Sequence, residues 1–147
     1  MNKKQIILIS IFLILILIVL AFFIGTKKVN SDLNVLTINN HKVKIEKVSS
    51  EENKARGLSG RKELLKNEGM LFVFENSQKW GIWMKDMLFS IDIVWLDEKM
   101  NIVDYKENVS PDTFPKIFFP NLPSKYVLEL PSGSIKTLDI EKGIAVY

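Results

Sequence analysis

The sequence of 147 residues has no cysteine and a single histidine, His41. Without cysteine, the chain can form no disulfide, no thiolate nucleophile and no Cys-ligated zinc site. The single histidine also argues against a metal site built on histidine and against a Ser-His triad within one chain. The sequence therefore predicts no metal and no cofactor, and no catalytic residue can be assigned from it.

Excess charge of one sign is also missing from most of the chain. The net charge of +3 arises from 20 basic and 17 acidic residues, but four lysines flank one apolar run: Lys3, Lys4, Lys27 and Lys28. Removing these four leaves 16 basic against 17 acidic residues after position 28, a net charge of −1. Nucleic-acid binding needs a strongly positive surface, so no nucleic-acid partner is expected.

One long hydrophobic run is present, Ile6–Ile24, and Ser10 is its only polar residue. As a helix it would span roughly 28 Å, close to the thickness of the hydrocarbon core of a bilayer. The alternative is a cleavable signal peptide, but the run is too long and lacks a small-x-small cleavage site. Residues 1–28 are therefore predicted to be a single-pass anchor in the lipid bilayer of the cell membrane. The flanking lysines are balanced, and the short N-terminus favours an extracytoplasmic domain.

After the anchor, residues 29–34 are expected to form a polar spacer and residues 35–147 a single globular domain. Ser50 and Gly57 are typical of the start and end of a short helix, and a second short helix is expected after Gly133. Short strands separated by turn signals predict a mostly β fold, a compact antiparallel sandwich or barrel with one or two short helices. The expected strands cover residues 35–38, 43–48, 70–74, 81–85, 91–96, 102–105, 126–130 and 144–147.

Several short segments occur in a characteristic order along the domain. They are residues 55–61 (ARGLSGR), 69–74 (GMLFVF), 83–87 (WMKDM), 91–95 (IDIVW), Pro111 and 126–133 (YVLELPSG). This ordered set resembles the domain-of-unknown-function 192 family, small bacterial and archaeal domains that are often secreted or membrane-anchored. The resemblance implies a compact, mostly β fold and no established activity. Gly143 is followed by Ile144, where the family often has an acid.

Trp83 and Lys85 are the first candidate ligand-binding residues. In a strand they point to one side, with Met84 on the other. Trp83 would then lie in a groove and stack on a sugar or planar ligand, while Lys85 would bind an anion. The simpler alternative is that Trp83 belongs to the core and that Lys85 extends to water.

Asp92 and Glu129 each interrupt a hydrophobic strand, and Arg56 and Arg61 precede them in a turn-rich segment. If the two strands are neighbours, the two carboxylates could share a face and perform acid–base chemistry. The alternative favoured by the sequence is structural, with each carboxylate paired to Arg56 or Arg61 through bidentate contacts.

Two further features have a functional and a structural interpretation. Met70, Met84 and Met87 would suit Cu(I) if they converge, although methionine in an apolar segment usually fills the core. Phe114 and Phe118 lie in a proline-rich loop, and they either cap the sheet or remain exposed to contact lipid or a protein partner.

These residues favour a binding or accessory module over an enzyme. The predicted function is a membrane-tethered extracytoplasmic domain that binds a small ligand, an envelope partner or a membrane protein. Its candidate ligand-binding residues are Arg56, Arg61, Trp83, Lys85, Asp92 and Glu129. The alternative is a hydrolase of envelope carbohydrate that uses Asp92 and Glu129, which requires the two carboxyl groups to lie roughly 5–9.5 Å apart in one cleft.

Overall fold

The computed structural model describes residues 2, 5 and 33–147. The chain divides into two units, residues 1–30 and 31–147, and the second contains every strand discussed below. The predicted anchor Ile6–Ile24 and residues 29–32 of the predicted spacer lie outside the described residues. Within the described residues, no helix is both long enough and apolar enough to cross a membrane.

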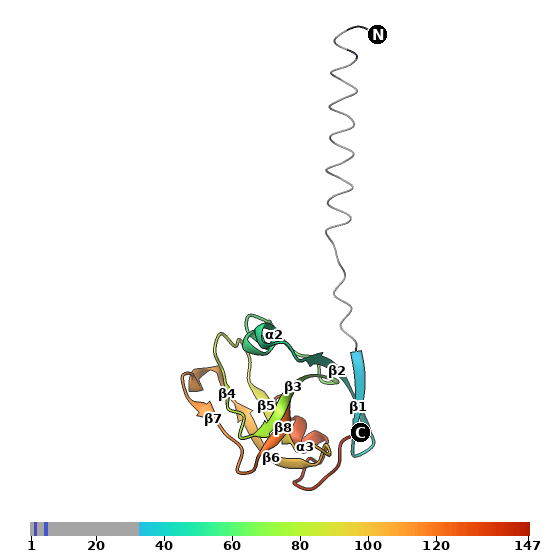
Figure 1. Ribbon diagram of the computed structural model, residues 1–147, viewed down its shortest axis with the longest axis vertical. Coiled ribbons are helices and arrows are strands. Elements are labelled where there is room, and N and C mark those ends of the chain that lie inside the picture. Colours follow the sequence, from blue (N-terminus) through green and yellow to red (C-terminus); the bar gives the residue numbers. More distant parts are fainter. Residues whose placement is uncertain (1, 3–4, 6–32) are drawn as a thin grey trace. The chain divides into compact units, whose positions relative to one another are not determined.

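The second unit is mostly β, as the sequence predicts, with two short α-helices (Figure 1). Its elements, in chain order, are β1 (Leu33–Ile38), β2 (His41–Val48), α2 (Glu51–Arg56), β3 (Glu68–Gln78), β4 (Ile82–Trp83), β5 (Ile91–Leu96), β6 (Ile102–Val109), the 3-10 helix η1 (Pro111–Thr113), β7 (Ile117–Phe118), β8 (Ser124–Pro131) and α3 (Ser134–Thr137). Six strands form one sheet in the order β1-β2-β3-β8-β5-β6, and β4 pairs with β7 in a small second sheet.

The expected antiparallel sandwich or barrel is wrong in two respects. Strands β2 and β3 are parallel, because the segment between them, which includes α2, carries the chain back to the end where β2 began. Among the described strands, β1 and β6 are the two ends of the large sheet and do not pair with each other, so the sheet is open rather than closed. The fold is therefore built on one mixed sheet.

Local sequence signals account for the β1–β2 hairpin and for α2. Asn39 and Asn40 adopt positive φ angles of 45° and 66°, as a tight hairpin turn requires. The Ser50 side chain accepts a hydrogen bond from the Asn53 N–H at the start of α2. At the other end Gly57 has a φ of +49°, and the Phe72 ring lies 3.2 Å from the position that a Cβ would take. Glycine therefore meets both the backbone and the packing requirement where the helix stops.

Apolar side chains cover both faces of the large sheet. On the first, here called the α3 face, Val94, Leu128 and Leu130 pack with Ile135 of α3. On the second, here called the β4 face, the cluster consists of Val48, Leu58, Met70, Phe72, Phe74, Ile82, Met84, Met87, Ile91, Ile93, Trp95, Val109 and Val127. All six residues of β5 are buried, so strands in the middle of the sheet have no face exposed to water.

The segment expected to be a strand over residues 81–85 contains only the two-residue strand β4. It pairs with β7, which lies in the proline-rich segment expected to be a loop, and the two strands lie side by side at one edge of the unit (Figure 1). The expected last strand, residues 144–147, is not a strand but is held by backbone contacts. Ala145 forms a bridge with Asn101, and the segment exchanges backbone hydrogen bonds with Met100, Ile102 and Thr37.

Asp92 of β5 forms hydrogen bonds with β6 and α3 on the α3 face of the sheet. Its neighbours Ile91 and Ile93 point to the β4 face, so the carboxylate points to the α3 face. One oxygen accepts a hydrogen bond from the N–H of Asn108 in β6, and the other accepts one from the N–H of Ile135 in α3, both at 2.8 Å. Asp92 is fully buried, and these two bonds compensate for the removal of its carboxyl oxygens from water.

We expect Asp92→Ala to lower the free energy of unfolding by about 2–4 kcal/mol, because two backbone donors lose their acceptor. Urea denaturation of the full-length protein, followed by circular dichroism, measures this loss. The control is Glu98→Ala, an exposed turn residue that should change the free energy by less than about 0.5 kcal/mol. Equal stability of the two variants would contradict the role assigned to Asp92.

Candidate functional site

A pocket opens on the β4 face, with a volume of about 220 Å³. One wall is formed by α2 and the turn after it, and the other by β4. The sheet forms the floor, with side chains from β3 and β8. The lining residues are Glu51, Lys54, Ala55, Arg56, Gly57, Leu58, Ser59, Phe72, Phe74, Gly81, Ile82, Trp83, Met87 and Glu129. Small-molecule sites have this combination of apolar walls and a few polar groups, and the volume here is below the roughly 300–1,000 Å³ of sites for drug-sized ligands.

Strand β8 places Glu129 at the floor of this pocket. Its neighbours Leu128 and Leu130 point to the α3 face, so Glu129 points to the β4 face. There it lies between Met70 of β3 and Ile93 of β5, its register partners on the two adjacent strands. The alternation of a central strand thus puts a carboxyl group among apolar side chains.

The Glu129 carboxyl is almost completely removed from water and lacks a partner. Only 5% of the residue is exposed, and Oε2 is buried without a hydrogen bond. Burial raises the pKa of Glu129 to about 8, and the positive charge of Arg61 opposes this rise only in part. At neutral pH the group is therefore mainly a neutral acid, which can donate one hydrogen bond.

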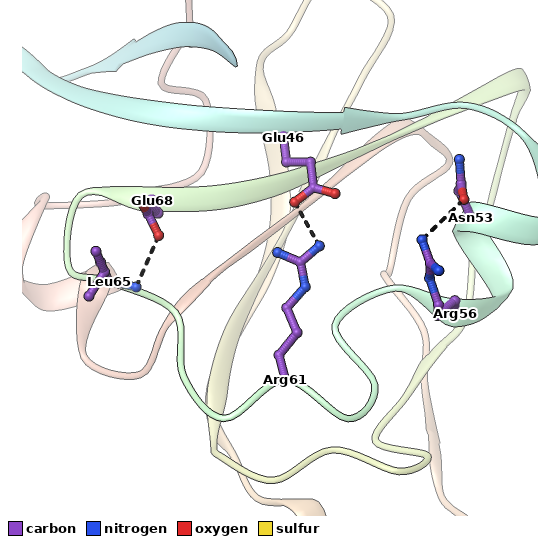
Figure 2. A network of polar contacts seen from close by, with 6 residues as sticks. All are labelled: Glu46, Asn53, Arg56, Arg61, Leu65 and Glu68. Carbon is purple, nitrogen blue, oxygen red and sulfur yellow. Dashed lines mark hydrogen bonds and ion pairs between the residues drawn. The ribbon is translucent and has the colours of Figure 1, made fainter. Parts of the chain in front are cut away.

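The two arginines expected to pair with Asp92 and Glu129 contact other residues. Figure 2 shows Arg61 extended toward Glu46 of β2, and the two form an ion pair with an Nη2–Oε2 distance of 2.6 Å. Arg56, the last residue of α2, turns back along its own helix, and its Nη2 donates to Asn53 Oδ1 at 3.4 Å. The predicted bidentate pairing is therefore wrong, since Arg61 acts on Glu129 only through its field.

Lys54 is a site residue that the sequence interpretation missed. Its side chain is only 8% exposed, and Nζ lies 4.8 Å from the centroid of the Phe74 ring. Trp80 stacks on the same ring at a centroid distance of 3.9 Å. Nζ also forms an ion pair with the exposed carboxylate of Glu51, three residues earlier. The i,i+3 spacing of Glu51 and Lys54 was the only signal for this arrangement in the sequence.

Trp83 and Lys85 have different positions. Trp83 lines the pocket and remains 48% exposed, with its ring edge-on to Phe114 at 6.2 Å between centroids. Lys85 is exposed and does not line the pocket, and its backbone carbonyl accepts a hydrogen bond from the Ser59 hydroxyl. Of the six candidate residues, the pocket brings together three: Arg56, Trp83 and Glu129.

Asp92 and Glu129 lie on neighbouring strands, which is the condition that the hydrolase hypothesis required. Their register nevertheless separates them, because Asp92 is opposite Leu130 and Glu129 is opposite Ile93. Side chains that are one position out of register point to opposite faces of a sheet. The two carboxyl groups therefore share no cleft, and the shared face expected from the sequence is wrong.

The three methionines considered as copper ligands are all buried in the apolar cluster of the β4 face. Met70 and Met84 are each 1% exposed, and Met87 is 9% exposed. They fill space between the sheet and β4, which is the structural role that methionine usually has in a core. Among the described residues, no group of three or more His, Asp and Glu side chains is placed to hold a metal ion.

Comparison with known proteins identifies relatives for almost the whole domain. The model of the DUF192 family, described as “Uncharacterized ACR”, matches residues 34–147. A UPF0127 protein from Thermococcus gammatolerans is 38% identical over 79 residues, which are 52% of this chain and 49% of that protein. A second UPF0127 protein, from Thermococcus kodakarensis, is 33% identical over 79 residues, 52% of this chain and 48% of that protein. The matched region thus spans about half the length of these curated relatives.

Two crystal structures have the same fold. One is of a Sinorhizobium meliloti protein described provisionally as a transcription regulator, with a TM-score of 0.71 and 26% identity over 77% of this chain and 89% of that one. The other is of a Novosphingobium aromaticivorans protein of unknown function, with a TM-score of 0.72 and 24% identity over 77% of this chain and 83% of that one. The second likeness concerns the fold alone.

The raised pKa of Glu129 makes the stability of the domain depend on pH. The folded state binds a proton that the unfolded state releases above its pKa of about 4.5, so the contribution of Glu129 to stability is most favourable below that pH. It should fall as the pH rises from about 4.5 to about 8 and then level off. We expect Glu129→Gln to remove most of this decline and to be more stable than the wild type at pH 8.5.

Urea denaturation at a series of pH values tests this expectation. Glu75→Gln is the control, because Glu75 is on β3 and exposed, and it should keep the wild-type profile. A Glu129→Gln profile that coincides with that of the wild type would show that Glu129 is ionised in the folded protein.

Proposed function

The chain belongs to the DUF192 family of uncharacterised proteins, and from this premise we propose that its domain is a binding module for a small ligand. The observation that supports the proposal is the Glu129 carboxyl, buried and without a partner at the floor of an open pocket. A buried polar group without a hydrogen bond costs about 1–3 kcal/mol. A ligand that forms a hydrogen bond with the carboxyl group would remove that cost. The removal of this cost would then add to the free energy of binding.

The walls of the pocket offer the other contacts that a ligand needs. Phe72 and Trp83 supply apolar surface, and Trp83 remains accessible at the mouth. Lys54 and Arg56 supply charge from α2, and Phe74 holds the Lys54 ammonium group in place. Both apolar area and oriented polar groups are therefore available in one small volume, which favours recognition of a small molecule.

Binding is favoured over hydrolysis by the environment of the second carboxyl group. The other acidic residue that lines the pocket is Glu51, whose side chain is 92% exposed and is paired with Lys54. A hydrolase of the proposed carbohydrate type needs two carboxyl groups positioned on either side of the scissile bond. The carboxyl pair that the sequence suggested for this role, Asp92 and Glu129, is divided between the two faces of the sheet.

We further propose that the domain works at the cell envelope, tethered to the membrane by Ile6–Ile24 and exposed outside the cytoplasm. The support is the length and composition of that run in the sequence. The net charge of −1 after position 28 supports a partner other than nucleic acid. The ligand would then be an envelope molecule of small size or part of a membrane protein.

A variant that fills the pocket tests the proposed function. Ala55 lines the pocket from the exposed side of α2, so Ala55→Trp should block the mouth without disturbing the core. We expect a fragment library of acids, amides, amines and sugars to contain compounds that bind the full-length wild-type protein and not Ala55→Trp. Ligand-observed NMR measures the binding.

The matched control is Glu52→Trp, which places the same side chain at an exposed position of the same helix that does not line the pocket. It should bind the same compounds as the wild type. If every compound that binds the wild type also binds Ala55→Trp, the pocket is not a ligand site and the proposed function is wrong.

A further inference from the structure

We infer that the ligand of this pocket is a small organic carboxylate with a ring or short apolar body, bound with its carboxylate between Glu129, Lys54 and Arg56. The inference rests on the proposed function, because it names the class of molecule that the same pocket would take. Its basis is the kind of hydrogen-bonding groups that face the cavity, together with the charge of the wall that carries them.

Most of the polar side chains that line the pocket can donate hydrogen bonds, and the exception is the Glu51 carboxylate, which is paired with Lys54. Lys54 and Arg56 can only donate hydrogen bonds. The Ser59 hydroxyl already donates to the carbonyl of Lys85. Glu129 donates when it carries its proton, which is its main state at neutral pH. A set of donors recognises an acceptor, and a carboxylate offers two acceptor oxygens with about four lone-pair positions.

The charges at the pocket also favour an anion. Lys54 is compensated by Glu51, while Arg56 forms no ion pair among the described residues and contacts only the neutral side chain of Asn53. Among the residues of α2 that line the pocket, positive charges therefore exceed negative charges by one, since the second acid of the helix, Glu52, does not line it. A cationic ligand would meet this charge without a fixed anion to balance it, because Glu129 is mainly neutral at pH 7. A carboxylate would pair with Arg56 in a bidentate contact.

A carboxylate and a protonated carboxyl group can share one proton. The Glu129 O–H would donate to one ligand oxygen, which would give a partner to a carboxyl group that has none in the protein. Hydrogen bonds that involve an ionised group are roughly twice as strong as neutral ones. The same contact cannot form once Glu129 is ionised, because two carboxylates at that distance repel each other.

The body of the ligand has an apolar surface beside the mouth of the pocket. Trp83 is half exposed there and pairs across the small sheet with Ile117, which is also exposed. Phe114 lies edge-on to Trp83. Gly81 is packed closely against this surface, because an added Cβ would lie only 2.5 Å from the Phe119 ring and 2.6 Å from Ile117. A flat or short apolar group could therefore rest on Trp83 while its carboxylate enters the pocket.

The expected pH dependence follows from the groups around Glu129. The charge that acts on it is that of Arg61 from the turn after α2, itself paired with Glu46 of β2. The other charged groups that line the pocket, Glu51, Lys54 and Arg56, come from α2. The neighbours of Glu129 on the other sides are apolar: Met70 and Phe72 from β3, Ile93 from β5, Ile82 and Trp83 from β4, and Met87. Deprotonation of Glu129 is therefore the change that should weaken carboxylate binding above a pH of about 8.

The test uses three probes of one shape and different charge: benzoate, benzamide and benzylamine. Isothermal titration calorimetry with the full-length protein measures their affinity at pH 6.5 and at pH 9.5. We expect benzoate to bind best at pH 6.5 and to bind roughly tenfold to thirtyfold more weakly at pH 9.5, because few molecules then have the binding-competent protonation state. Ala55→Trp should abolish benzoate binding, and Glu52→Trp should preserve it.

The variant Glu129→Gln separates the effect of the Glu129 proton on binding from the effect of this side chain on folding. The amide of glutamine has the shape of the protonated acid and keeps a donor, so this variant should bind benzoate at pH 6.5 within a few-fold of the wild type and should lose the pH dependence. Arg56→Gln should weaken benzoate about tenfold, the order of one charge-assisted hydrogen bond. Lys62→Gln is its control, since Lys62 is exposed and does not line the pocket.

The outcomes distinguish the inference from the proposed function. If benzamide or benzylamine binds as tightly as benzoate and Ala55→Trp blocks it, the pocket is a ligand site and the carboxylate inference is wrong. Benzoate binding that does not change between pH 6.5 and pH 9.5, or equal displacement by inorganic phosphate, also overturns the inference. If no compound of the fragment library or of this probe set depends on the pocket, both fail.

Discussion

Strands β5 and β8 lie in the middle of a sheet that is packed on both faces, and this burial constrains every polar side chain on them. Asp92 and Glu129 are both almost inaccessible to water, although they point in opposite directions. A carboxyl group in such a position must find hydrogen bonds or keep its proton. Asp92 follows the first course, since two backbone N–H groups hold its oxygens. Glu129 instead keeps its proton. Asp92 is therefore a structural residue, whereas Glu129 belongs to the candidate site.

Whether the carboxyl group at the floor of the pocket has a partner depends on the residue with which Arg61 pairs. Arg61 forms its ion pair with Glu46 on β2, so it influences Glu129 without bonding to it. An Arg61–Glu129 ion pair would have given the carboxyl group a partner within the protein. A ligand that bonded to this group would then gain less free energy. Because the arginine is already bound elsewhere, the buried acid is left to face the cavity with Lys54, Arg56 and Trp83 around it.

Some features of the fold could be predicted from local sequence because they depend on a few neighbouring residues. The turn at Asn39 and Asn40, the cap at Ser50 and the helix end at Gly57 all formed as expected. The parallel pairing of β2 and β3 was not predictable in this way, because it depends on where the chain returns after α2. Strand β7 could not be predicted from the proline-rich segment in which it lies. A strand of two residues is defined by its partner, here β4, rather than by its own composition.

The sequence by itself determined the family, the mostly β character of residues 33–147 and the near-neutral charge of that part of the chain. It also singled out Trp83, Arg56 and Glu129, because each is unusual in its local segment. Only the tertiary structure decided that these three meet in one pocket and that Asp92 does not join them. The physical reason is strand register, since a shift of one residue between β5 and β8 sends a side chain to the other face of the sheet. The place of Lys54 in the site was likewise decided by the tertiary structure, because the Phe74 ring that it contacts belongs to a different element, β3.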